Sequence, residues 1–84
     1  MNNAAATLAK LQAKVDGAYW SAKFHNKTNF RPEFEVGMGL CLASYRAAGS
    51  TKYFSQDRLG LSGAMADGFN HAARALMLAE STNG

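Results

Sequence analysis

Apolar residues recur at alternating steps of three and four along the first quarter of the chain. This spacing places one apolar side chain per turn on a single helical face. It predicts a helix over residues 4–26, with Asn2 or Asn3 as the N-cap. The apolar positions of this helix are Ala4, Leu8, Leu11, Val15, Ala18 and Ala22.

A second helix is predicted over residues 32–48. Pro32 suits the first helical turn, where its missing N–H is not needed. Glu33 and Glu35 follow at the positive end of the helix dipole. Gly49 then provides a residue that tolerates the left-handed conformation in which helices commonly end. The apolar stripe of this helix comprises Phe34, Met38, Leu42 and Tyr45.

The last predicted helix covers residues 55–80. Ser55 is its expected N-cap, and Asp57 lies in its first turn. Its expected buried face comprises Leu61, Met65, Phe69, Ala72, Leu76 and Ala79.

Small residues also form columns at intervals of four. The third predicted helix has Gly60, Ala64, Gly68 and Ala72, and the second has Gly39, Ala43 and Ala47. Because small side chains let two helix backbones approach closely, these columns predict tight helix–helix contact, either within one subunit or between subunits.

The 84 residues therefore predict a single all-α domain over residues 1–84, folded as a small three-helix bundle. Of these residues, 48% are apolar and only 18% are charged, against about a quarter in an average domain. A chain this short has little room to bury so much apolar surface alone. We therefore expect a homo-oligomer, most simply a dimer, to complete the bundle.

The net charge is +3, and the first third of the chain carries the whole excess, because five cations between Lys10 and Arg31 face the single Asp16. Trp20, Lys23 and Lys27 fall on one helical face, with Tyr19 beside them and Arg31 shortly after. Aromatic rings beside cations can stack on a base and neutralise a phosphate. The alternative is that the aromatic side chains pack in the core or an interface, while the lysines are only solvated.

A loop with the sequence AGSTKYFSQD connects the last two predicted helices. Ser50 and Lys52, with Arg46 one turn earlier, could supply donors to an anion. The order of residues is not that of a Walker A loop. A hinge in which Tyr53 and Phe54 fill the gap between helices is therefore the preferred interpretation, and phosphate contact is the alternative. The predicted binding residues are Tyr19, Trp20, Lys23, Lys27, Arg31, Arg46 and Lys52.

Catalytic groups do not form a convincing set. Asp67 and His71 are four residues apart on one helical face, but no third partner accompanies them. His25 has only Glu33 or Glu35 nearby across a turn. We therefore expect no enzyme activity, no cofactor and no metal site.

The lone Cys41 excludes an intramolecular disulfide and favours a cytoplasmic protein. No apolar run approaches the length of a membrane span, so no membrane partner is expected.

The sequence also suggests two functions other than simple binding. Residues Leu59–Ser62 resemble the turn of a helix-turn-helix, but the helix that would begin at Gly63 lacks side chains that read base edges. The second is a structural adaptor that joins larger proteins through the small-residue columns. In style the chain is similar to the small accessory proteins of phages and mobile elements, many of which act as inhibitors or sponges against host defence, although no motif carries that likeness.

The favoured prediction is thus a non-catalytic binding protein. It would sequester an acidic partner, either a nucleic-acid-handling protein or a phosphorylated nucleotide, through the basic and aromatic residues.

Overall fold

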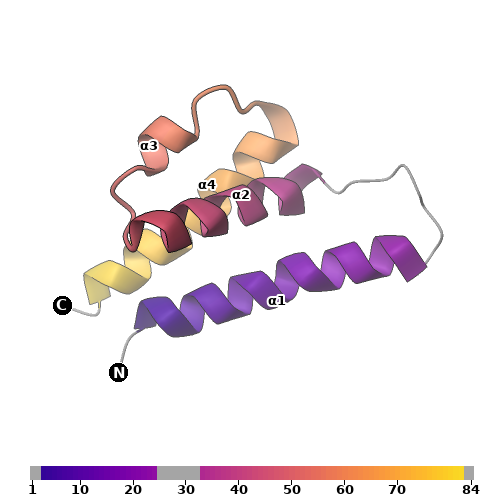
Figure 1. The fold of residues 1–84 in the computed structure, drawn as a ribbon, viewed down its shortest axis with the longest axis horizontal. Coiled ribbons are helices and arrows are strands. Elements are labelled where there is room, and N and C mark those ends of the chain that lie inside the picture. The colour runs from indigo at the N-terminus through magenta and orange to yellow at the C-terminus, as the bar shows by residue number, and fades with distance from the viewer. Residues whose placement is uncertain (1–2, 25–32, 83–84) are drawn as a thin grey trace.

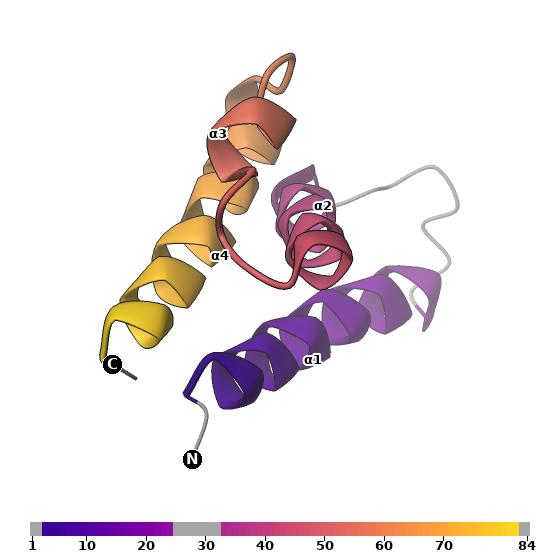
Figure 2. The ribbon, with the colours of Figure 1, turned by 60° about the vertical axis from the view of Figure 1, so that its left-hand side comes forward.

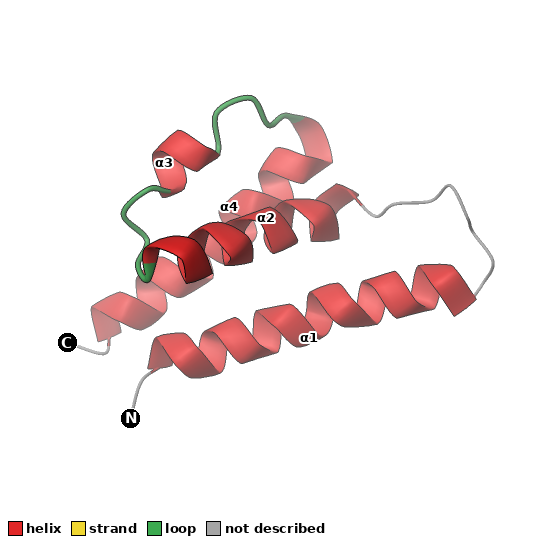
Figure 3. Cartoon of the chain, viewed as in Figure 1, coloured by secondary structure: helices red, strands yellow, loops and turns green. Residues whose placement is uncertain are grey.

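The computed structural model describes residues 3–24 and 33–82, and they form helices joined by turns (Figures 1 and 3). No strand occurs in these two ranges, which confirms the predicted all-α class. The described helices are α1 (Asn3–Phe24), α2 (Glu33–Ala48), α3 (Phe54–Asp57) and α4 (Gly63–Thr82).

The two predicted helices in the first half of the chain are confirmed over their described residues. Along α1, Ala4 and Leu11 are buried, and Leu8 and Val15 are partly buried against the core. The end of α2 has the predicted glycine cap, because Gly49 has a φ of 74° and its N–H donates to the Tyr45 carbonyl at 2.7 Å.

The prediction of one helix over residues 55–80 is wrong. Residues 58–62 separate the single turn of α3 from α4. Gly60 has a φ of 90° and Gly63 a φ of 61°, a left-handed region that a continuous right-handed helix does not contain. Ser55 is not a cap either, since Tyr53 occupies the N-cap position of α3 and makes no side-chain capping bond.

Helix α2 packs against α4 and α1, α1 also contacts α4, and the short α3 packs on α2 (Figure 2). Phe69 of α4 is 1% exposed, and its ring meets that of Phe54 edge-on at 5.7 Å between centroids. The buried core comprises Leu11, Met38, Cys41, Leu42, Phe54, Phe69, Ala72, Ala73 and Leu76. Most of these residues belong to the expected apolar stripes of α2 and α4.

Two glycines allow α2 and α4 to touch through their backbones. A Cβ atom built at Gly68 would lie 1.7 Å from the Phe34 carbonyl oxygen, and one at Gly37 would lie 1.9 Å from that of Met65. Each glycine thus accommodates the backbone of the opposite helix. The close approach that the small residues predict occurs here within one subunit.

The predicted columns contribute unevenly to this contact. On α4, Gly68 and Ala72 are buried, whereas Ala64 is exposed and Gly60 lies outside the helix. On α2 the glycine at the crossing is Gly37, which the sequence analysis did not single out.

The other members of the α2 column lie elsewhere. Gly39 has the Val15 side chain of α1 3.7 Å from its would-be Cβ atom, and Ala43 and Ala47 are exposed. Among the described helices, none is long and apolar enough to cross a membrane.

Candidate functional site

The structure does not describe the side chains of five of the seven predicted binding residues. The side chains of Tyr19, Trp20 and Lys23 are not described, although their backbone belongs to α1. Lys27 and Arg31 fall within residues 25–32, which are not described. The basic and aromatic cluster near the end of α1 therefore stays a prediction.

The other two predicted residues, Arg46 and Lys52, are described and exposed. The Arg46 Nη1 atom donates to Gln12 Oε1 at 2.6 Å, and Gln12 Nε2 in turn donates to Asp16 Oδ1 at 2.9 Å. Arg46 thereby links α2 to α1. The Lys52 Nζ atom lies 5.5 Å from the centroid of the Tyr53 ring, within the range of a cation–π contact.

The loop before α3 is anchored by one aromatic side chain rather than two. Phe54 is 5% exposed and packs between Phe69 and Tyr45, whose ring centroid lies 6.3 Å away. Tyr53 is 44% exposed, so its predicted role as a second plug is wrong. The Lys52 backbone N–H donates to the Ser50 hydroxyl at 3.3 Å and is therefore engaged within the loop.

Two carboxylates hold the elements together through neutral partners. The Ser44 hydroxyl donates to Asp57, which ties α3 to α2. The Tyr45 hydroxyl donates to Glu80 Oε2 at 3.5 Å, which ties α2 to α4. Burial, together with the charge of Glu80 and its hydrogen bond, raises the pKa of Tyr45 above its ordinary value.

The His71 ring contacts an aromatic side chain. Its centroid lies 5.5 Å from that of Phe34, and the Lys14 Nζ atom lies 5.7 Å from the centroid of the same Phe34 ring. The described residues contain no group of three or more histidine, cysteine or acidic side chains that could hold a metal ion. Cys41 is fully buried, and burial raises the pKa of its thiol to about 12.

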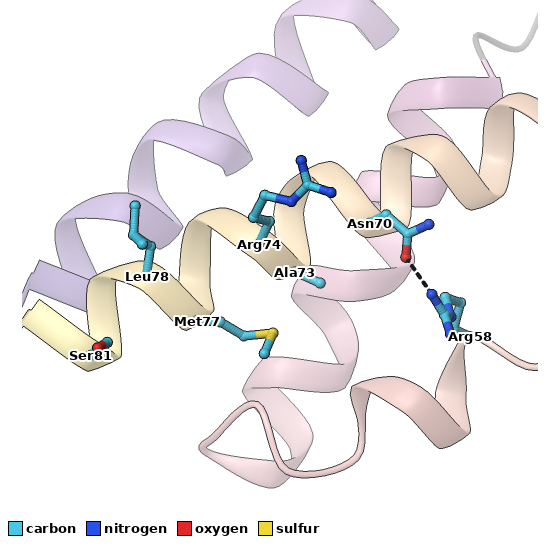
Figure 4. Close-up of a pocket in the computed structure, with 7 residues that line it drawn as sticks. All are labelled: Arg58, Asn70, Ala73, Arg74, Met77, Leu78 and Ser81. Atoms are coloured by element: carbon cyan, nitrogen blue, oxygen red, sulfur yellow. Dashed lines mark hydrogen bonds between the residues drawn. The ribbon is translucent and has the colours of Figure 1, made fainter.

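A groove of about 450 Å³ lies on the outer side of α4 (Figure 4). The sequence analysis did not identify this site. Its residues on α4 recur at helical spacing, and one further residue comes from the turn after α3. The lining comprises Arg58, Asn70, Ala73, Arg74, Met77, Leu78 and Ser81.

This α4 groove combines exposed apolar side chains with two cations. Met77 is 54% and Leu78 66% exposed, which is unusual for large apolar residues placed side by side on one helix. Arg58 Nη1 donates to Asn70 Oδ1 at 3.1 Å, and this bond positions the guanidinium at the edge of the groove (Figure 4). Arg74 is exposed on α4, and no acidic residue lines the groove.

A signal for the α4 groove was present in the sequence. Met77 and Leu78 follow the buried Leu76 directly and cannot share its face of the helix. Arg58 gave no signal, because its place beside Asn70 depends on the turn at residues 58–62.

Comparison of the chain with protein-family models, with curated proteins and with solved structures finds no match. The functional argument therefore rests on the residues themselves.

Proposed function

We propose that this chain is a non-catalytic binding protein that sequesters or obstructs an acidic partner, in the manner of the inhibitors and sponges carried by phages and mobile elements. The partner is a nucleic-acid-handling protein or a phosphorylated nucleotide ligand. The binding surface comprises the basic and aromatic residues of the α1 end together with Arg46 and Lys52. Homo-oligomerisation of the bundle is part of the same proposal.

The distribution of charge supports this proposal. The chain has nine lysines and arginines and six acidic residues. Three of the nine cations, Lys23, Lys27 and Arg31, lie within residues 18–32, which contain no acidic residue. The six cations elsewhere equal the six acids in number, so the whole net charge of +3 comes from this one segment. A localised positive charge beside aromatic residues favours an anionic ligand.

Native mass spectrometry of the protein purified from its own cells tests the proposal. A phosphorylated ligand appears as a small added mass, and a protein partner appears as a complex of higher mass. We expect the Lys23→Glu/Lys27→Glu variant to lose this bound species while circular dichroism shows an unchanged helix content. The matched control is Lys10→Glu/Lys14→Glu, which changes the net charge equally at two lysines earlier in the chain.

Retention of the bound species by the Lys23→Glu/Lys27→Glu variant would contradict the proposed surface. Equal loss in both variants would show that total charge, rather than a local site, governs binding.

One observation favours a small DNA-binding regulator as the second candidate. Helix α4 begins at Gly63, directly after the Leu59–Ser62 turn, as a helix-turn-helix requires. The first turns of α4 weaken this candidate, because their exposed residues include Gly63, Ala64 and Asp67. None of these three can donate the paired hydrogen bonds by which a positively charged helix reads bases. A DNA-binding function predicts gel-shift affinity for duplex DNA that falls steeply as salt rises.

A structural adaptor is supported less well. Gly68 packs against the backbone of α2 and Ala72 is fully buried, so this part of the column is already used within the subunit.

A further inference from the structure

We propose that the α4 groove is a docking site for an acidic amphipathic helix of a partner protein. This inference rests on the proposed function, from which it takes an acidic protein as the partner. It assigns a second binding surface, separate from the cluster near the end of α1.

The groove has the dimensions of a helix-binding site. Its α4 residues run from Asn70 to Ser81, which at 1.5 Å per residue is about 16 Å, or three turns of a docked helix. Ala73, Met77 and Leu78 supply apolar contact along this length (Figure 4). Amphipathic helices bind such grooves through apolar side chains spaced three and four residues apart.

The charge of the groove selects among possible occupants. Arg58 and Arg74 lie among the lining residues beside the apolar side chains, and the lining contains no carboxylate to balance them. Carboxylates on the flanks of a docked helix would form charge-assisted bonds with both guanidinium groups. Arginine is also the cation most suited to interface ion pairs, because its planar group is weakly hydrated and binds carboxylates at two points.

A second copy of this chain fits the groove less well. If α4 packed on α4 of a symmetry-related copy, each subunit would bring two arginines and no acid from the groove into one interface. Like charges that meet in an interface are destabilising. A nucleic-acid backbone is also disfavoured, because it would place phosphates against Met77 and Leu78 and meet only two cations.

The test uses a displayed library of helical peptides of about sixteen residues, roughly four turns, randomised along one face and its flanks. The full-length protein is the bait, and the affinities of enriched peptides are measured by fluorescence polarisation. We expect enriched peptides to carry leucine or methionine at intervals of three and four, with aspartate or glutamate on the flanks.

Variants then locate the site. Arg58→Glu/Arg74→Glu is expected to weaken binding of the enriched peptides by at least about tenfold. Met77→Ser/Leu78→Ser removes apolar contact without changing the charge and is expected to weaken binding by a similar factor. If Arg58→Glu/Arg74→Glu folds poorly, Arg74→Glu alone replaces it, because that variant keeps the Arg58–Asn70 hydrogen bond. The Lys23→Glu/Lys27→Glu variant should bind these peptides as the unaltered protein does.

Several results would overturn the inference. They are the absence of any enriched peptide, enrichment without acidic residues, or equal binding by the groove variants. Loss of binding in Lys23→Glu/Lys27→Glu alone would place the peptide on the surface of the proposed function instead. A dimer in analytical ultracentrifugation that Leu78→Glu dissociates would assign the groove to a second copy. Binding to phosphatidylglycerol vesicles that Arg58→Glu/Arg74→Glu abolishes would assign it to a lipid surface.

Discussion

Replacement of Gly68 by alanine should destabilise the protein although alanine is the better helix former. The added Cβ atom would lie 1.7 Å from the Phe34 carbonyl oxygen. Ordinary van der Waals contact begins at 3.4 Å, so α2 and α4 must move apart by about 1.7 Å at this point. The obstacle is backbone, and no change of side-chain rotamer can relieve it.

The magnitude follows from what the separation does to the core. Met38 and Phe69 are fully buried where the two helices meet. A gap of 0.5–1 Å removes roughly a quarter to a half of the dispersion energy of the atoms that face it. Overpacking of this kind costs about 1–3 kcal/mol, occasionally more, and the gain in helix propensity returns about 1 kcal/mol. Because the contact is with a rigid carbonyl, the cost lies at the upper end of this range, and we expect a net loss of about 2 kcal/mol.

Urea and thermal denaturation, followed by circular dichroism at 222 nm, measure this loss. A loss of 2 kcal/mol lowers the midpoint temperature by about 8–16 °C in a domain of this size. Gly17→Ala is the matched control, because Gly17 is exposed within α1 and nothing lies within 4 Å of its would-be Cβ atom. That control should gain about 0.5–1 kcal/mol. If Gly68→Ala were as stable as Gly17→Ala, the close contact between α2 and α4 would not exist.

Three further predictions concern the loop and the core. Phe54→Ala should cost about 3–5 kcal/mol, whereas Tyr53→Ala should cost well under 1 kcal/mol, as measured by the same denaturation experiments. Gly60→Ala should cost about 1–2 kcal/mol from backbone strain alone, since its φ is 90° and no atom crowds its Cβ position; equal stability would show that the turn has another conformation. The Cys41 thiol should react with a thiol reagent only when the protein unfolds. Because its pKa is raised to about 12 on folding, stability should fall as pH rises above about 8.5, by up to about 1.4 kcal/mol per unit, and Cys41→Ala should remove this part of the slope.

The sequence was sufficient to predict the helices whose ends carry strong local signals. Helix α2 begins at the acidic pair after Pro32 and ends at Gly49, and both signals depend only on neighbouring residues. The buried stripes of α2 and α4 also follow from the spacing of their apolar residues. Residues at intervals of three and four share one helical face, and that face is the one that packs on the core.

The break before α4 could not be predicted from periodicity. Leu61 and Met65 continue the apolar spacing of α4 backwards, and Leu61 does pack against the core. The turn changes the direction of the chain through the left-handed Gly60 and Gly63, yet it leaves Leu61 in contact with the core and so preserves the apolar spacing. Gly60 and Gly63 were the available signals, but Gly60 also begins a column of small residues at intervals of four, which is equally typical of close helix packing.

The candidate binding site was less accessible to sequence reasoning than the fold. The charge cluster near the end of α1 is visible in the sequence because its members are neighbours along the chain. The α4 groove is visible only in part: Met77 and Leu78 can be recognised from their spacing, but the place of Arg58 depends on how α3 and α4 are arranged. Gly37 was missed for the same reason, since its importance lies in the Met65 carbonyl of another helix.

The turn that the sequence did not reveal is also what creates the α4 groove. In one continuous helix, Arg58 would lie twelve residues before Asn70, about 18 Å away along the axis, and could not reach it. Because the chain reverses at residues 58–62, the Arg58 guanidinium instead donates to Asn70 at 3.1 Å. Phe54, buried against Phe69, fixes the short α3 from which this turn departs. The left-handed Gly60 and the Phe54 anchor therefore determine both the stability of the loop and the position of one of the two cations that face a bound helix.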